Sequence, residues 1–334
     1  MAIDPTAYAL TEWRAAIKAE TTAGTINKTS MQLVNIDSPA TITRNPYLFT
    51  GVRSGVGRTA KKADAYTSEY GQEKSISISG LLDTTVGLIL IENCLGVKKT
   101  VTIDVPANYT NEVTLGATGI ADNIHTLSFV NIVPEGDNSE YYAGCIVDEL
   151  KITMDTASDG GRAKFDATLK TRGNREVAAA PTTPSAFGET VPNIFLFGAA
   201  NSVVSIATLG ATADVILDSL ELNFKANAQW GGVGANGVGQ VINRGMPEIE
   251  INGIFGVKFD ANTVASNTRY LAGTTVYVCI HNAATLAESD FGFTGAYGKI
   301  TADVNPEDVR SGAYVKVPIK FMAHTVGNII QVKI

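Results

Sequence analysis

Cysteine and histidine are scarce in this chain of 334 residues, and each shortage excludes a class of protein. The three cysteines, Cys94, Cys145 and Cys279, are far apart and odd in number, so they form neither a disulfide framework nor a paired metal knuckle. We expect three buried free thiols. The three histidines stand singly, without a second ligand at metal spacing, so the sequence predicts no metal or other cofactor.

An excess of basic over acidic residues and long apolar runs are also lacking. The formal net charge is -7, which argues against a protein that grips nucleic acid through its phosphates, because that needs a basic footprint. The first twenty residues lack the basic start and apolar run of a signal peptide, and no segment approaches the roughly 20 apolar residues that cross a bilayer. We therefore expect synthesis in a cytoplasm and no membrane partner.

What the chain does contain is period-two alternation, clearest over residues 141–173. Ile146, Leu150, Ile152 and Met154 fall on one face of a predicted strand, and Asp148 interrupts that face. The alternation resumes after a turn-forming run at 157–161, so the segment predicts one long hairpin. Its outer face has both signs of charge and no catalytic grouping, which favours an assembly surface over an active site.

The other segments predict a mostly β protein with few helices. An N-terminal helix or arm occupies 1–29, with Asp4 and Pro5 at its start and Gly24 as its stop. A long polar loop, 43–72, shows neither the strand period of two nor the helical period of 3.6, and it is expected to be functional or ordered by a partner. An amphipathic helix is expected at 84–95, and the proline-bearing segment 176–192 is typical of a linker.

Short matches in the same order indicate an internal repeat. The segment Ile76–Gly80 matches Ile249–Gly253, and Lys151–Asp155 matches Lys299–Asp303. A third match joins residues 36–38 to 217–219, and a candidate helix at 262–271 corresponds to the one at 84–95. We therefore expect a first β domain at 30–175 and a second at 193–334, each with a flanking helix.

Apparent nucleotide motifs do not fit their mechanism. Residues 232–237 spell G-x-G-x-x-G, but a second strand rather than a helix follows them, so a flexible loop is the better interpretation. A basic and aromatic cluster in the long loop is compatible with stacking on nucleic acid or with an acidic neighbouring subunit, and the net charge favours the subunit. Its residues are Arg53, Arg58, Lys61, Lys62, Tyr66 and Tyr70.

With these elements in place, the chain resembles the major tail tube proteins of long-tailed bacteriophages. The resemblance rests on the strand Tyr142–Ile152, the Asp-Gly-Gly turn, the return strand Lys164–Lys170, the strand and helix over 77–96, and the segment Ala313–Phe321. It implies tandem tail-tube-type β-sandwich or barrel domains that form rings, stacked into a tube through which the genome passes. Such a protein belongs to the virion tail and is not an enzyme.

The resemblance also gives the polar faces and the loop their expected roles. The loop cluster would form contacts between rings, and phage DNA would pass the lumen without specific binding. Trimeric rings with pseudo-sixfold symmetry are expected, hexamers being the alternative, with other tail proteins as further partners. The expected lumen residues are Glu149, Lys151, Asp155, Asp166, Glu221, Glu248, Glu250 and Asp303. A carbohydrate-binding or adhesin-type β-sandwich is the second interpretation of the whole chain.

Overall fold

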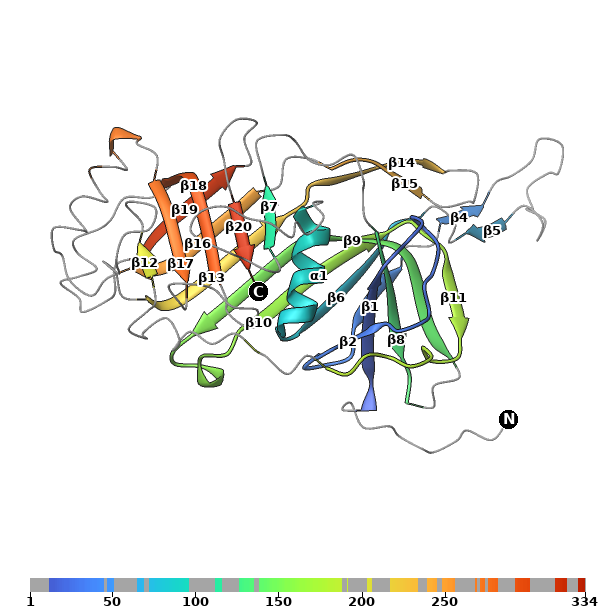
Figure 1. Ribbon diagram of the computed structural model, residues 1–334. Coiled ribbons are helices and arrows are strands. Elements are labelled where there is room, and N and C mark those ends of the chain that lie inside the picture. The colour runs from blue at the N-terminus through green and yellow to red at the C-terminus, as the bar shows by residue number, and fades with distance from the viewer. Residues whose placement is uncertain are drawn as a thin grey trace.

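The fold was obtained as a computed structural model and is mostly β, as predicted (Figure 1). The residues it describes are 12–44, 47–50, 65–68, 72–95, 112–115, 126–134, 138–187, 191, 203–205, 217–233, 239–244, 248–255, 268, 271–273, 276–281, 292–300, 316–322 and 330–333.

Sixteen strands of the described residues form one antiparallel sheet, and four more form two separate hairpins. The first half of the chain contributes β1 (Arg14–Ala19), β2 (Gln32–Val34), β3 (Thr41–Arg44), β6 (Lys74–Leu81), β7 (Glu112–Leu115), β8 (Leu127–Ile132), β9 (Ser139–Asp155), β10 (Lys164–Thr171) and β11 (Arg175–Ala178). The second half contributes β12 (Val203–Ser205), β13 (Leu217–Lys225), β16 (Glu248–Phe255), β17 (Val276–His281), β18 (Gly292–Ile300), β19 (Lys316–Met322) and β20 (Ile330–Lys333). The hairpins are β4 (Tyr47–Thr50) with β5 (Ala65–Ser68), and β14 (Ala228–Val233) with β15 (Gly239–Arg244).

The predicted long hairpin is confirmed as β9 and β10. Its turn is a short 3-10 segment, Asp159–Gly161, in which Gly160 and Gly161 have positive φ angles of 65° and 75°. The interruption at Asp148 is a β-bulge: Thr168 faces Glu149 while Leu169 faces Val147, so Asp148 has no partner across the ladder. The bulge turns the Asp148 side chain away from the apolar face, which explains the break in the alternation.

β9 is long enough to belong to two parts of the sheet. Its first residues pair with β8 and β11, and its remainder pairs with β10 and β13. Gly144, with a φ angle of 63°, lies just before the change of partners, since pairing with β8 ends at Cys145 and pairing with β10 begins at Ile146. The buried Glu20 carboxylate accepts a hydrogen bond of 2.8 Å from the Gly144 amide and others from Thr126 and Ser128. These bonds hold the chain at the bend.

The strand order repeats within the sheet. The order β9-β10-β6-β3 in the first half is matched by β18-β19-β16-β13 in the second, and β9 pairs with β13 where the two runs meet. Each half also has a separate hairpin at the equivalent place in the sequence. Along the chain, β4–β5 comes between β3 and β6, and β14–β15 comes between β13 and β16. The matched segments 76–80 and 249–253 fall on the equivalent strands β6 and β16.

The match of Lys151–Asp155 with Lys299–Asp303 needs a correction in register. Thr168 of β10 faces Ser77 of β6, and Lys320 of β19 faces Glu250 of β16, which is the residue that matches Ser77. On their other sides, Thr168 faces Glu149 of β9 and Lys320 faces Lys299 of β18. Lys299 therefore corresponds to Glu149 rather than to Lys151. A slip of two residues keeps the same face of a strand, so the sequence pattern could not detect it.

The helix α1 (Thr84–Leu95) begins and ends where it was predicted. Asp83 caps its first turn, because its carboxylate accepts a 2.8 Å bond from the Val86 amide. Figure 1 shows α1 lying across the sheet, where its side chains Leu90, Ile91 and Cys94 join the core formed by the apolar face of the strands. It contacts β9 and β13, so one helix covers the line where the two halves meet.

Three predictions about the irregular segments are wrong in part. The N-terminal helix does not extend over 14–19, where β1 pairs with β8 and buries Ala15, Ala16 and Ile17; residues 1–11 lie outside the described part. The loop 43–72 contains the end of β3 and the hairpin β4–β5, whose short strands give little periodicity. The expected linker 176–192 begins in β11, because β9 extends far enough to pair with it.

The second candidate helix, 262–271, is described only at Thr268 and Leu271, both helical. The division of the chain into two tandem domains stays a prediction.

Candidate assembly surface

The strands β3, β6, β10, β9 and β13 present one polar face opposite the face that α1 covers. Along β9, Leu150, Ile152 and Met154 are buried, whereas Glu149 is exposed and Lys151 is partly exposed. The same alternation places Asp166 on the polar face of β10 and Glu221 on that of β13. Alternation on a half-buried sheet thus brings side chains from distant segments into one surface.

Cross-strand register aligns the expected lumen residues in rows. One row runs Thr41, Ser77, Thr168, Glu149, Lys225 and Glu248. The next runs Ser79, Asp166, Lys151, Asn223 and Glu250. Glu221 stands opposite Thr153, and Asp155 opposite Ser219. Seven of the eight expected residues therefore occupy strands of one sheet, and Asp303 lies outside the described residues.

The polar face is hollowed. A depression of about 490 Å³ is lined by side chains from all five strands, among them Thr41, Ser77, Asp166, Lys151, Asn223 and Lys225. No described group of histidine, cysteine, aspartate and glutamate side chains is arranged to hold a metal ion. The lining has hydroxyl, amide and both kinds of charged group spread along rows, an arrangement that suits a wall better than a converging site.

The line where β9 pairs with β13, which we name the cis seam, joins seven residues of each strand from Asp155↔Ser219 to Glu149↔Lys225. Two ion pairs cross it on the polar face: Lys151 to Glu221 at 2.9 Å and Lys225 to Glu149 at 3.7 Å. The amide of Ala226 donates to the Asp148 carbonyl at 2.9 Å, which extends the ladder to the bulge. Opposite charges on facing strands favour this register.

The bulge beside the cis seam is held by two further contacts. The Asn93 side chain of α1 accepts a 2.7 Å hydrogen bond from the buried Val147 amide. On the polar side, Lys170 forms a 2.7 Å ion pair with Asp148. The hydrogen bond to Asp148 raises the pKa of Lys170 against the opposing effect of burial.

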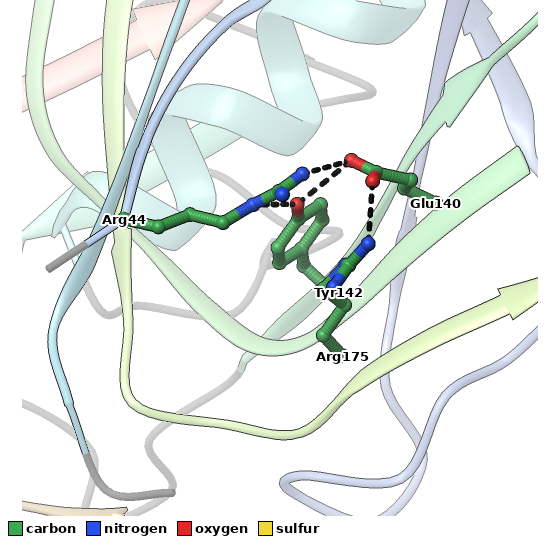
Figure 2. Close-up of polar contacts among 4 residues, drawn as sticks. All are labelled: Arg44, Glu140, Tyr142 and Arg175. Atoms are coloured by element: carbon green, nitrogen blue, oxygen red, sulfur yellow. Dashed lines mark hydrogen bonds and ion pairs between the residues drawn. The ribbon is translucent and has the colours of Figure 1, made fainter. Parts of the chain in front are cut away.

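A second polar cluster stands where β3 leads into the hairpin β4–β5 (Figure 2). Arg44 at the end of β3 donates to the Tyr142 hydroxyl at 3.0 Å and forms an ion pair with Glu140. Arg175 of β11 approaches the other oxygen of Glu140 at 2.8 Å. The cluster connects β3, β9 and β11, and it anchors the start of the hairpin to the body of the fold.

Charge and burial compete within this cluster. Burial alone would raise the pKa of Glu140, but hydrogen bonds from Tyr142 and Arg175 and the charges of the two arginines hold that pKa below its usual value. Burial would lower the pKa of Arg44, yet its interactions with Tyr142 and Glu140 raise it. Burial also raises the pKa of the Tyr142 hydroxyl. The ionised pair and neutral tyrosine are therefore the stable state at neutral pH.

The expected contact residues of the long loop are only partly described. Tyr66 lies in β5, opposite Phe49 of β4. Arg53, Arg58, Lys61, Lys62 and Tyr70 lie outside the described residues.

Sequence reasoning missed the Arg44 cluster because its members are far apart along the chain and belong to no motif. The available signal was a charged residue, Glu140, beside the buried tyrosines at the start of β9. The cysteine expectation is confirmed for Cys94 and Cys145, which are buried free thiols, and burial raises the pKa of Cys145. The side chain of Cys279 lies outside the described part of the chain. Such thiols pack as small core groups.

Comparison with known proteins found no matching family model and no similar curated sequence. Among the described residues, no helix is both long and apolar enough to span a membrane.

Proposed function

We propose that this chain is a structural subunit that assembles with copies of itself into rings, and that the rings stack as the tail tube of a long-tailed bacteriophage. In this role it is a virion component without catalytic activity. Its measurable property is polymerisation, and its partners are further copies, other tail proteins and the DNA that passes through.

The observation that carries this proposal is the repeated strand order. The second half follows the first in the same sheet, with β13 joined to β9. The outer edges of this eight-strand run, β3 at one end and the last residues of β18 at the other, are the strands equivalent to β13 and β9. An arrangement that joins unlike edges in the same sense is heterologous, and it closes into a ring when the rotation permits.

Closure would also remove the liability of open sheet edges. In the described part of the chain, β3 pairs only with β6, and Lys299 and Ile300 pair only with β19. Unpaired strand edges favour association with another chain, and a closed barrel eliminates them. The polar face then becomes the lumen wall, since α1 and the core occupy the opposite face.

The mixed charge of that wall fits a duct for DNA. Glu149, Lys225, Lys151 and Glu221 neutralise one another across the cis seam. A dense basic lining would instead bind phosphates, with an affinity that falls as salt rises, and would slow passage. A wall of paired charges lets DNA pass without specific binding.

Tandem domains imply a ring of three chains with pseudo-sixfold symmetry. Each chain would supply two of six similar lobes, one for each run of four strands. A hexameric ring, in which only one half builds the barrel, is the alternative.

The two hairpins are proposed as contacts between rings. β3 and β13 run in the same direction in the antiparallel sheet. The hairpins β4–β5 and β14–β15 follow the C-terminal ends of these two strands, so both leave the sheet on the same side, at the strand ends (Figure 1). Six such hairpins in a ring of three would project toward one neighbouring ring.

Electron microscopy of the concentrated protein tests the proposal. Tubes of stacked rings are the expected result, and a protein that stays monomeric under all conditions would contradict it. Replacing residues 51–64 by Asn-Gly keeps β4 and β5 joined by a favourable two-residue turn. This variant should fold and form rings, but stack poorly, whereas normal tubes would show that the loop is not a contact between rings.

A further inference from the structure

The cis seam specifies the register in which two copies of this chain would meet. This inference rests on the proposed function and adds the residues of the joint. The equivalence of strands is fixed by pairing: Thr41 faces Ser77 on β6, and Asn223 faces Glu250 on β16. Because residues 76–80 correspond to 249–253, Ser77 corresponds to Glu250. Thr41 therefore corresponds to Asn223, and Thr43 to Lys225.

The other edge follows in the same way. Lys299 corresponds to Glu149, and Ile300 to Leu150. In the cis seam, Glu149 faces Lys225 and Leu150 faces Phe224. We propose that β3 of one copy pairs antiparallel with the end of β18 of a second copy, with Lys299 opposite Thr43 and Ile300 opposite Ile42. We name this joint the trans seam.

The pairing matches faces as well as positions. Thr43 is exposed on the polar face of β3, and Lys299 lies in the row that contains Glu250 and Asn223. Ile42 lies on the opposite face, where it packs partly buried against the core. A slip of one residue would set Ile300 opposite polar residues, so the faces exclude it. A slip of two would set Lys299 opposite Thr41, and this is the register that the sequence match alone would give.

The two seams therefore differ in charge. The position of Lys225 in the cis seam is occupied by Thr43 in the trans seam, and that of Glu149 by Lys299. The trans seam thus has a lysine facing a hydroxyl where the cis seam has an ion pair. Lys299 also stands opposite Lys320 within its own chain. A carboxylate at position 43 would give the trans seam a pair of opposite charges like that of Glu149 and Lys225 in the cis seam.

Engineered disulfides test the register. Residues directly opposite in antiparallel strands lie within reach of a disulfide, whereas a pair two residues out of register is farther apart than its geometry allows. The Thr43→Cys, Lys299→Cys double variant should form bonds between chains under mild oxidation of assembled protein, up to a covalent ring. The matched Thr41→Cys, Lys299→Cys variant should not.

Charge variants test the pairing of position 43 with position 299 independently. Thr43→Glu should lower the protein concentration needed for assembly and Thr43→Lys should raise it, by about twofold to fivefold for each seam. Thr43→Lys combined with Lys299→Glu should restore assembly. Tubes in which the Thr41→Cys, Lys299→Cys variant cross-links instead, or in which the charge variants behave alike, would overturn the trans seam but leave the proposed function intact. If neither the parent chain nor any variant assembles, the proposed function itself fails.

Discussion

The cis seam and the open edges are built from equivalent strands, yet they are stabilised very differently. At the cis seam, two ion pairs cross the polar face, Phe224 and Leu222 are buried on the other face, and α1 contacts both strands. At the edge of β3, Thr43 is exposed and Ile42, the equivalent of Phe224, is only partly buried.

Under the proposed function, this difference separates a joint that forms during folding from a joint that forms during assembly. Covalent linkage keeps the two halves of a chain together, so the cis seam is completed during folding. Among the described strands, β3 is the last of the run and pairs only with β6, and in the proposed ring a second copy would supply its other neighbour. The strand β7 forms a second link between the two halves of the chain, because it comes from the first half and pairs with β20 of the second.

The largest expected difference in stability is between alanine substitutions at Phe224 and at Ile42. Phe224→Ala removes a ring that is 1% exposed, and it should lower the free energy of unfolding by about 3–5 kcal/mol. Ile42→Ala should cost less than half as much in the isolated subunit, because Ile42 is only partly buried. Urea denaturation of the unassembled protein measures both values. Equal losses would mean that the edge of β3 is already part of a complete core.

A smaller loss is expected at the bulge beside the cis seam. Asn93→Ala removes the acceptor of the buried Val147 amide and should cost about 1–3 kcal/mol. Asn223→Ala, on the polar face, is the control and should stay within about 0.5 kcal/mol. The same denaturation experiment compares them, and an unchanged midpoint for Asn93→Ala would show that the bulge needs no support from α1.

Acid should weaken the polar cluster that holds the end of β3. The folded-state pKa of Glu140 is lowered, so its stabilisation is complete above the unfolded pKa, near 4, and is lost as pH falls through the folded value. Glu140→Gln should cost about 1–2 kcal/mol at pH 7 and flatten this acid-side loss. Denaturation at pH 7 and at about pH 3 measures it, with Glu149→Gln as the exposed control. A mutant with the same pH dependence as the parent would exclude Glu140 as the responsible group.

Much of this arrangement follows from sequence, and the rest depends on contacts that are distant along the chain. Alternation located β9 and β10, and an amphipathic pattern located α1, because these signals are local. The residues of β1 fit helical spacing as well as a strand, because Trp13 and Ile17 stand four apart, and only pairing with β8 decides between the two. The polar face could be assigned strand by strand, but the bulge at Asp148 and the register of the repeat depend on which strands pair.

The smallest effect is expected for the ion pairs of the cis seam. The Lys151 and Glu221 side chains are 43% and 33% exposed, so water and salt screen their attraction. Lys151→Ala and Glu221→Ala should each change stability by no more than about 0.5 kcal/mol, with less effect at high salt. A double-mutant cycle measures the coupling. A coupling of several kcal/mol would mean that charge, rather than apolar burial, holds the cis seam.

The mass of a single ring released from assembled tubes tests the central claim most directly. The account predicts three copies of the 35.2 kDa chain, with six similar lobes in end-on image averages calculated without imposed symmetry. Six copies in each ring would contradict the pairing of two tandem domains around one barrel, and a protein that forms no ring would contradict self-assembly altogether.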